Sequence, residues 1–135
     1  MGDGASEVSF RLAGGAQPLI LIGASVNGGP AHDFILDTGA SGTVVSKELA
    51  QLLGIESAPV PQLTGAGGMA EVTAGVVSSL AVAEARAEDL AVVLVDFLPA
   101  LSRAVMTRLD GIIGYNFLKQ FRVTIDYPNE TLSFD

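Results

Sequence analysis

The chain is a succession of short β-type runs separated by glycine and proline. Sixteen glycines and six prolines are spread over 135 residues, and apolar or β-branched runs such as 18–26, 72–82 and 90–97 lie between them. Residues 123–126 and 131–134 flank a Tyr-Pro-Asn-Glu turn and predict a hairpin. Short strands bounded by turn residues are typical of sandwiches and barrels. The sequence therefore predicts one mostly-β domain with about eight short strands.

One or two short helices are expected among these strands. Ser46 precedes Lys47–Leu53 and Gly54 follows it, which is the usual arrangement of a helix between a side-chain N-cap and a glycine stop. Residues 115–121 predict a second short helix. Residues 98–110 show no clear period, and we expect a loop with a helical turn there.

The composition excludes several classes of function. A mass of 13.8 kDa allows one core, and a net charge of −8 with seven scattered cations argues against binding to nucleic-acid phosphates. No apolar run approaches the roughly 20 residues that span a bilayer. The chain has no cysteine and a single histidine, so thiolate catalysis and zinc ribbons are excluded and no metal or other cofactor is expected. We expect the lone His32 at the surface.

The N-terminus has no basic region followed by an apolar stretch, so the first residues do not read as a signal peptide. We expect residues 1–6 to be a disordered or extraneous segment, and residues 7–135 to form the single domain. The sequence does not fix the cellular compartment. A soluble domain released from a membrane-tethered or periplasmic precursor is one alternative.

One motif places an acidic group where a strand should be buried. The apolar run 34–36 leads directly into Asp37, Thr38, Gly39, Ala40 and Ser41. A carboxylate at the buried end of a strand is costly unless it is used, and glycine allows the chain to turn sharply beside it. An Asp-Thr-Gly turn also ends many strands without any catalytic role. The motif alone therefore leaves both interpretations open.

Two further segments are ordinary when each is taken singly. One is an apolar strand with glycines at both ends that leads into the predicted helix at 115, and it consists of Gly111, Ile112, Ile113 and Gly114. The other is a glycine cluster that alone predicts no more than a flexible hairpin turn, and it consists of Gly65, Ala66, Gly67 and Gly68.

In their order and spacing, the three segments resemble the retropepsin-like aspartic proteases. The similarity covers residues 8–134 and is greatest to the bacterial single-domain type, with retroviral and DNA-damage-inducible-type proteases as more distant relatives. The resemblance implies a closed acid-protease barrel with a psi loop, in which residues 111–114 cross beneath the catalytic loop. It also implies that Asp37 is catalytic, that residues 38–41 support its loop, that 65–68 form a flap over substrate, and that 112–114 support the psi loop.

The same resemblance implies an endopeptidase that acts on extended peptides and needs two aspartates. The chain has one Asp-Thr-Gly, and we interpret Asp33, Asp110 and Asp126 as solvated or structural. The second carboxylate is therefore expected from another subunit of a homodimer. Thr38 of each loop would then bind the opposite loop.

The chain departs from the family pattern at several points. Ser41 stands where retroviral members often carry an acidic residue, and 98–110 is longer than the matching retroviral connection. Neither terminus has the pattern of the interleaving strand of retroviral dimers, although 131–134 is a candidate. Two alternatives remain at this stage: a latent or non-catalytic peptide-binding or dimerisation module with the same fold, and an unrelated β-barrel.

Overall fold

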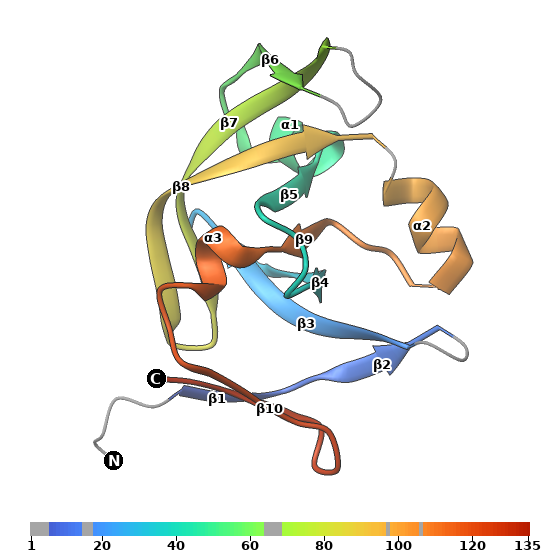
Figure 1. The fold of residues 1–135 in the computed structure, drawn as a ribbon, viewed down its shortest axis with the longest axis vertical. Coiled ribbons are helices and arrows are strands. Elements are labelled where there is room, and N and C mark those ends of the chain that lie inside the picture. The colour runs from blue at the N-terminus through green and yellow to red at the C-terminus, as the bar shows by residue number, and fades with distance from the viewer. Residues whose placement is uncertain (1–5, 15–17, 64–68, 97, 106) are drawn as a thin grey trace.

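The computed structural model describes residues 6–14, 18–63, 69–96, 98–105 and 107–135 (Figure 1). The strands are β1 (Ser6–Ser9), β2 (Arg11–Ala13), β3 (Leu19–Val26), β4 (Ala31–Leu36), β5 (Thr43–Ser46), β6 (Ser57–Leu63), β7 (Met69–Val82), β8 (Ala85–Val95), β9 (Gly111–Ile113), β10 (Val123–Asp126) and β11 (Thr131–Phe134). The helices are α1 (Lys47–Leu53), α2 (Leu98–Val105) and α3 (Tyr115–Leu118). The mostly-β class is confirmed.

The larger sheet closes on itself. Its strand order is β2-β3-β4-β9-β5-β8-β7-β6, and an additional antiparallel pairing between β3 and β7 joins the two sides of the order. The strands between these two contacts therefore form a closed barrel, β3-β4-β9-β5-β8-β7. Both β2 and β7 pair with β3: β2 pairs with its first three residues and β7 with its last two. The predicted closed barrel is thus confirmed.

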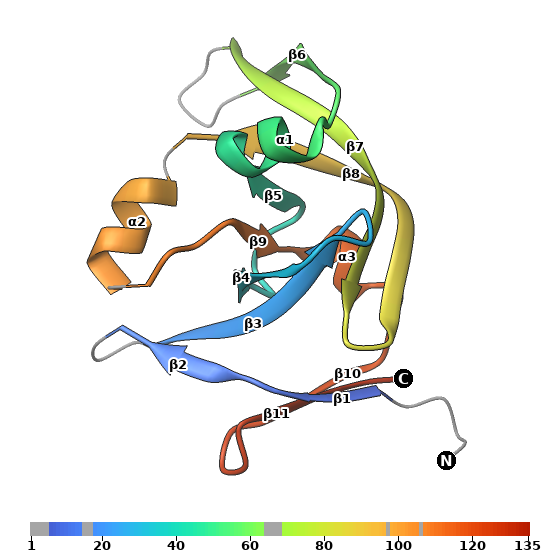
Figure 2. The same ribbon diagram turned by 180° about the vertical axis from the view of Figure 1, so that it is seen from behind.

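Alternation along β3 and β4 places side chains on both faces of the barrel wall. Phe34 and Leu36 belong to the main core cluster inside the barrel, whereas Ile35 packs in a second cluster with Leu21 and Leu98. Because successive side chains of a strand point to opposite faces, one strand supplies both clusters. Leu98, the first residue of helix α2, is buried in this second cluster, and Figures 1 and 2 show the α2 ribbon to one side of β9 and β4.

Local signals predicted helix α1 to its exact bounds. The Ser46 side chain accepts a hydrogen bond from the Leu49 N–H at 3.0 Å, and Gly54 adopts φ 69°, a left-handed conformation that glycine reaches without strain. Residues 98–110 differ from the expectation of a helical turn, because Leu98–Val105 is a full helix. Helix α3 ends at Leu118, and the chain continues to Phe121 in a tighter turn with i→i−3 bonds.

A separate three-stranded sheet is formed by the two ends of the chain. Its order is β1-β11-β10, and the predicted hairpin of β10 and β11 is confirmed. Phe134 of β11 packs edge-to-face against Phe117 and Phe121, which fixes this sheet to the barrel. Since β11 is paired with β1 on one edge and β10 on the other, neither of its edges is open to a strand from a second copy.

Within the described ranges, no helix has both the length and the apolar character required to cross a membrane.

Candidate active site

Asp37 lies on the loop 37–42, which connects β4 to β5. Strand β9 inserts between these two strands, parallel to β4 with Leu36 opposite Ile113, and antiparallel to β5 with Val44 opposite Ile112. Figures 1 and 2 show β9 between the β4 and β5 ribbons. A strand that comes from later in the chain and pairs with both neighbours of the loop is the psi arrangement that the sequence predicted. The main chain of residues 111–114 thus supports the Asp37 loop.

Two glycines are required by the close approach of these segments. A Cβ atom on Gly111 would meet the Phe34 ring and the Val44 carbonyl oxygen. A Cβ on Gly114 would overlap the Gly42 carbonyl and crowd that of Ala40. Backbone contact at this distance leaves no room for any larger residue. The glycines that frame the two isoleucines therefore have a steric cause.

The main chain of Asp37 is held by the strand beneath it, and its carboxylate is held by its own loop. The Asp37 N–H donates to the Ile113 carbonyl at 3.0 Å, and Asp37 Oδ1 accepts the Gly39 N–H at 2.9 Å. The Ala40 N–H closes the turn on the Asp37 carbonyl at 3.2 Å. Asp37, Thr38, Gly39 and Ser41 are exposed and Ala40 is half-buried. The carboxylate is therefore fixed in direction and open at the surface of the single chain.

A side-chain network locks the loop from the other side. The Thr43 hydroxyl donates to Asn116 Oδ1 at 2.7 Å and accepts the Gly114 N–H at 3.2 Å. Asn116 Nδ2 donates in turn to the Ala91 carbonyl at 2.8 Å, while the Tyr115 N–H reaches the Ala40 carbonyl at 2.8 Å. No sequence pattern pointed to Thr43 or Asn116. The one feature that could have indicated them is that each carries a polar side chain close to one of the two motifs, Thr43 after 37–41 and Asn116 after 111–114.

The structure brings the Asp37 motif and residues 112–114 together as expected. The expected flap residues Gly65, Ala66, Gly67 and Gly68 lie outside the described residues. The strands on either side of them, β6 and β7, are paired antiparallel up to Leu63 opposite Met69. The flap assignment therefore stays a prediction.

Other carboxylates that the sequence singled out lie elsewhere. Asp126 accepts hydrogen bonds from Asn129 in the β10–β11 turn, and Asp33 forms a 2.7 Å ion pair with Arg11. Asp110 precedes β9, at the end of the psi strand opposite to Ile113. In the described part of the chain, none of the three belongs to the loop that carries Asp37.

His32 differs from the surface position that we expected. Its side chain is 18% exposed, and Nδ1 lies 3.2 Å from Oδ2 of the buried Asp110, which also accepts from Arg108 Nε at 3.3 Å. The pair is separated by 78 residues in the chain, so no local pattern pointed to it. Because β4 and β9 are parallel neighbours, the residue at the start of β4 reaches the one before β9.

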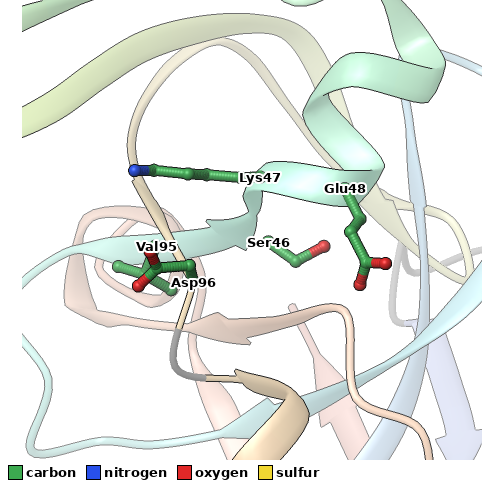
Figure 3. A pocket seen from close by; sticks show the side chains of 5 residues that line it. All are labelled: Ser46, Lys47, Glu48, Val95 and Asp96. Atoms are coloured by element: carbon green, nitrogen blue, oxygen red, sulfur yellow. The ribbon is translucent and has the colours of Figure 1, made fainter.

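The small pocket in Figure 3 is not lined by the loop that carries Asp37. Ser46, Lys47 and Glu48 at the start of α1 line it together with Val95 and Asp96 at the end of β8. Its volume of about 60 Å³ is enough for one or two water molecules and far too small for a peptide. Among the described residues, no group of three His, Asp or Glu side chains is placed to hold a metal ion.

Comparisons with known proteins agree with this geometry. The profile of a family described as aspartyl protease matches residues 22–117, which include the Asp37 loop and the psi strand. A retropepsin-like aspartic protease from Rickettsia conorii is 21% identical, with a TM-score of 0.68 over 96% of this chain and 90% of that one. The retroviral protease-like domain of Ddi1 from Leishmania major is 17% identical, with a TM-score of 0.57 over 87% and 88% of the two chains.

No curated protein sequence matches the chain. The two structural similarities, at this level of identity, establish a shared fold. The family match covers most of the chain and contains its one Asp-Thr-Gly. The chain therefore belongs to the aspartyl protease family and has the retropepsin-like fold.

Proposed function

We propose that the protein is an aspartic endopeptidase in which two copies of the chain each contribute Asp37. The observation that carries this proposal is the placement of Asp37: its N–H is bonded to Ile113, its Oδ1 is bonded to Gly39, and its side chain is exposed. A carboxylate that is held by the Gly39 N–H, on a main chain anchored to the psi strand, and that is open to the outside is suited to meet a second one across a two-fold axis. Family membership supports the same chemistry.

The chemistry requires one carboxylate in each protonation state. Two carboxyl groups in close contact do not both ionise, so the pair holds one proton and titrates as a unit. The ionised Asp37 takes a proton from water as the water oxygen attacks the peptide carbonyl carbon, and the protonated Asp37 gives its proton to the carbonyl oxygen. The Asp37 that took the proton from water then donates it to the peptide nitrogen, and the other Asp37 takes a proton from one hydroxyl of the tetrahedral diol as the C–N bond breaks. No covalent enzyme intermediate is formed.

The remaining motif residues have roles around this pair. Thr38 of each copy grips the opposite loop, because a hydroxyl both donates and accepts and two symmetry-related copies can satisfy each other. Gly39 contributes backbone to the cleft, and the small Ala40 and Ser41 leave room beside the carboxylate. Residues 65–68, which follow β6 in the sequence, are assigned as the flap that closes over a substrate bound in extended form.

A second candidate function is a non-catalytic or latent module of the same fold. The described part of one chain presents a single carboxylate on the 37–42 loop, so a strict monomer would have no partner for Asp37. Such a module would bind extended peptides or dimerise without hydrolysing them.

Replacement of Asp37 by Asn tests the proposal. The Asp37→Asn variant should lose about a thousandfold or more of its activity on unfolded protein substrates while its unfolding midpoint stays near that of the wild type. Asp96→Asn serves as the matched control, because Asp96 is an exposed aspartate that is not part of the motif. Retained cleavage by a pure Asp37→Asn preparation would contradict the proposal. Binding without cleavage by the wild-type dimer would favour the module instead.

A further inference from the structure

We propose that Tyr115 is a contact residue between two copies of the chain, with its exposed ring packed beside the two-fold axis that brings the Asp37 pair together. This inference rests on the proposed homodimeric function. It assigns to that interface a side chain that lies outside the three sequence motifs.

The position of Tyr115 is tied to that of Asp37 through the main chain. The Tyr115 N–H donates to the Ala40 carbonyl at 2.8 Å, and two residues earlier the Ile113 carbonyl accepts the Asp37 N–H at 3.0 Å. Both ends of the catalytic turn are thus bonded to the short stretch 113–115. In the proposed homodimer the loop that carries Asp37 faces the second copy, and the backbone of Tyr115 is bonded to that same loop.

The tyrosine ring has no place in the interior of its own chain. Helix α3 buries Phe117 and Leu118, whereas Tyr115 is 57% exposed. Among the described residues, its ring forms no aromatic pair and its hydroxyl forms no hydrogen bond. An ordered helix therefore presents a large aromatic side chain to the outside, anchored at its backbone.

Other exposed apolar side chains lack this connection. The described chain exposes Leu52, Val76 and Tyr127 to a comparable or greater extent and Leu12 to a smaller one, but none of them lies on a segment bonded to the 37–42 loop. Tyr127 is the closest match in chemistry: it is 56% exposed, and its ring packs edge-to-face on Phe10 at the β10–β11 turn. That turn lies well apart from β4 and β9 in both Figures 1 and 2.

The charge of the chain favours a neutral contact between two copies over one made by ion pairs. Each copy carries a net charge of −8, so long-range electrostatics oppose association of two copies. The loop itself, residues 37–42, contains an acid and no cation. Tyrosine offers a large contact area with few rotatable bonds and is enriched among the residues that dominate interfaces. Because the backbone of Tyr115 is bonded to the loop that would face the second Asp37, a second copy is the occupant that we assign to this side chain.

The test compares Tyr115→Ala with Tyr127→Ala by sedimentation over a series of concentrations, together with peptidase assays at the same concentrations. Because the contact occurs twice in a two-fold interface, Tyr115→Ala should raise the dimer dissociation constant by roughly 30-fold or more. Tyr127→Ala should leave it within about threefold of the wild type. At concentrations where Tyr115→Ala is again dimeric, it should cleave with a kcat near the wild-type value.

Each of three results would overturn the inference. The first is a Tyr115→Ala variant that dimerises like the wild type, and the second is equal weakening by Tyr127→Ala. The third is an unchanged dissociation constant with a raised KM, which would place Tyr115 against the substrate. A wild-type chain that stays monomeric at every concentration would instead contradict the proposed function itself. The two failures are therefore distinguishable.

Discussion

His32 Nδ1 lies 3.2 Å from Asp110 Oδ2, and this contact joins the first residues of β4 to the residue that precedes the psi strand. The main chain of Asp110 forms two further hydrogen bonds. Its N–H donates to the Asp33 carbonyl and its carbonyl accepts the Ser46 N–H, each at 2.9 Å. One buried aspartate thus links β4 and β9 to the junction of β5 and α1. These are the elements that hold the Asp37 loop.

Replacement of His32 by Ala should destabilise the protein by about 1–3 kcal/mol, because it leaves the buried Asp110 carboxylate without one of its two side-chain partners. Nε2 of His32 is buried with no partner in the described structure, so the Nδ1 contact is the polar interaction that is lost. Urea unfolding would measure the effect. Arg108→Ala is the control: Arg108 also reaches Asp110 but is 70% exposed, and its loss should cost less than about 0.5 kcal/mol. Equal effects would contradict the prediction.

Gly114→Ala should destabilise the protein by about 3 kcal/mol or more, because the new Cβ would overlap the Gly42 carbonyl beneath the Asp37 loop. The control is Gly42→Ala, which makes the same change at the other residue of this contact. A Cβ there meets nothing within 4 Å, and this variant should unfold close to the wild type. Thermal unfolding of both proteins measures the difference. A stable Gly114→Ala variant would show that the loop and the psi strand can separate without cost.

Thr43→Val should lower the free energy of unfolding by about 1–3 kcal/mol, because the Gly114 N–H and Asn116 Oδ1 both lose the hydroxyl that satisfies them. Thr43 is fully buried, so water does not replace the lost bonds. Thr43→Ser keeps the hydroxyl and should recover most of the loss. Hydrogen exchange at the Gly114 amide should rise in the Val variant and stay slow in the Ser variant. Fast exchange in both would show that the hydroxyl does not hold this amide.

These contacts show which parts of the molecule were predictable from the sequence. Helix α1 was predicted to its exact bounds because Ser46 and Gly54 act within one turn of the helix they cap. The psi arrangement followed from motif order and family resemblance, since its pairing joins Phe34 to Gly111 across more than half of the chain. The partners of Thr43 and His32 are 73 and 78 residues away, and no local pattern encodes them.

Helix α2 is a local element that the sequence did not predict. Its segment lacked a clear period, and Pro99 stands in its first turn, where a missing N–H costs little because helix starts leave these groups unpaired. Burial of Leu98 against Leu21 and Ile35 stabilises the helix from outside the segment. Tertiary packing therefore decided a structure that local propensity left open.

Mixing the wild type with Asp37→Asn should reduce activity beyond simple dilution. If each dimer needs two Asp37 carboxylates, a mixed dimer has only one and does not cleave. With random pairing at a ninefold excess of the variant, about one wild-type chain in ten finds a wild-type partner, so activity per wild-type chain should fall to about a tenth. The measurement is peptidase activity after the mixture has exchanged subunits, with Asp96→Asn added in place of Asp37→Asn as the control. Activity that stays proportional to the wild-type chain alone would show that one copy is sufficient, and would exclude a shared site.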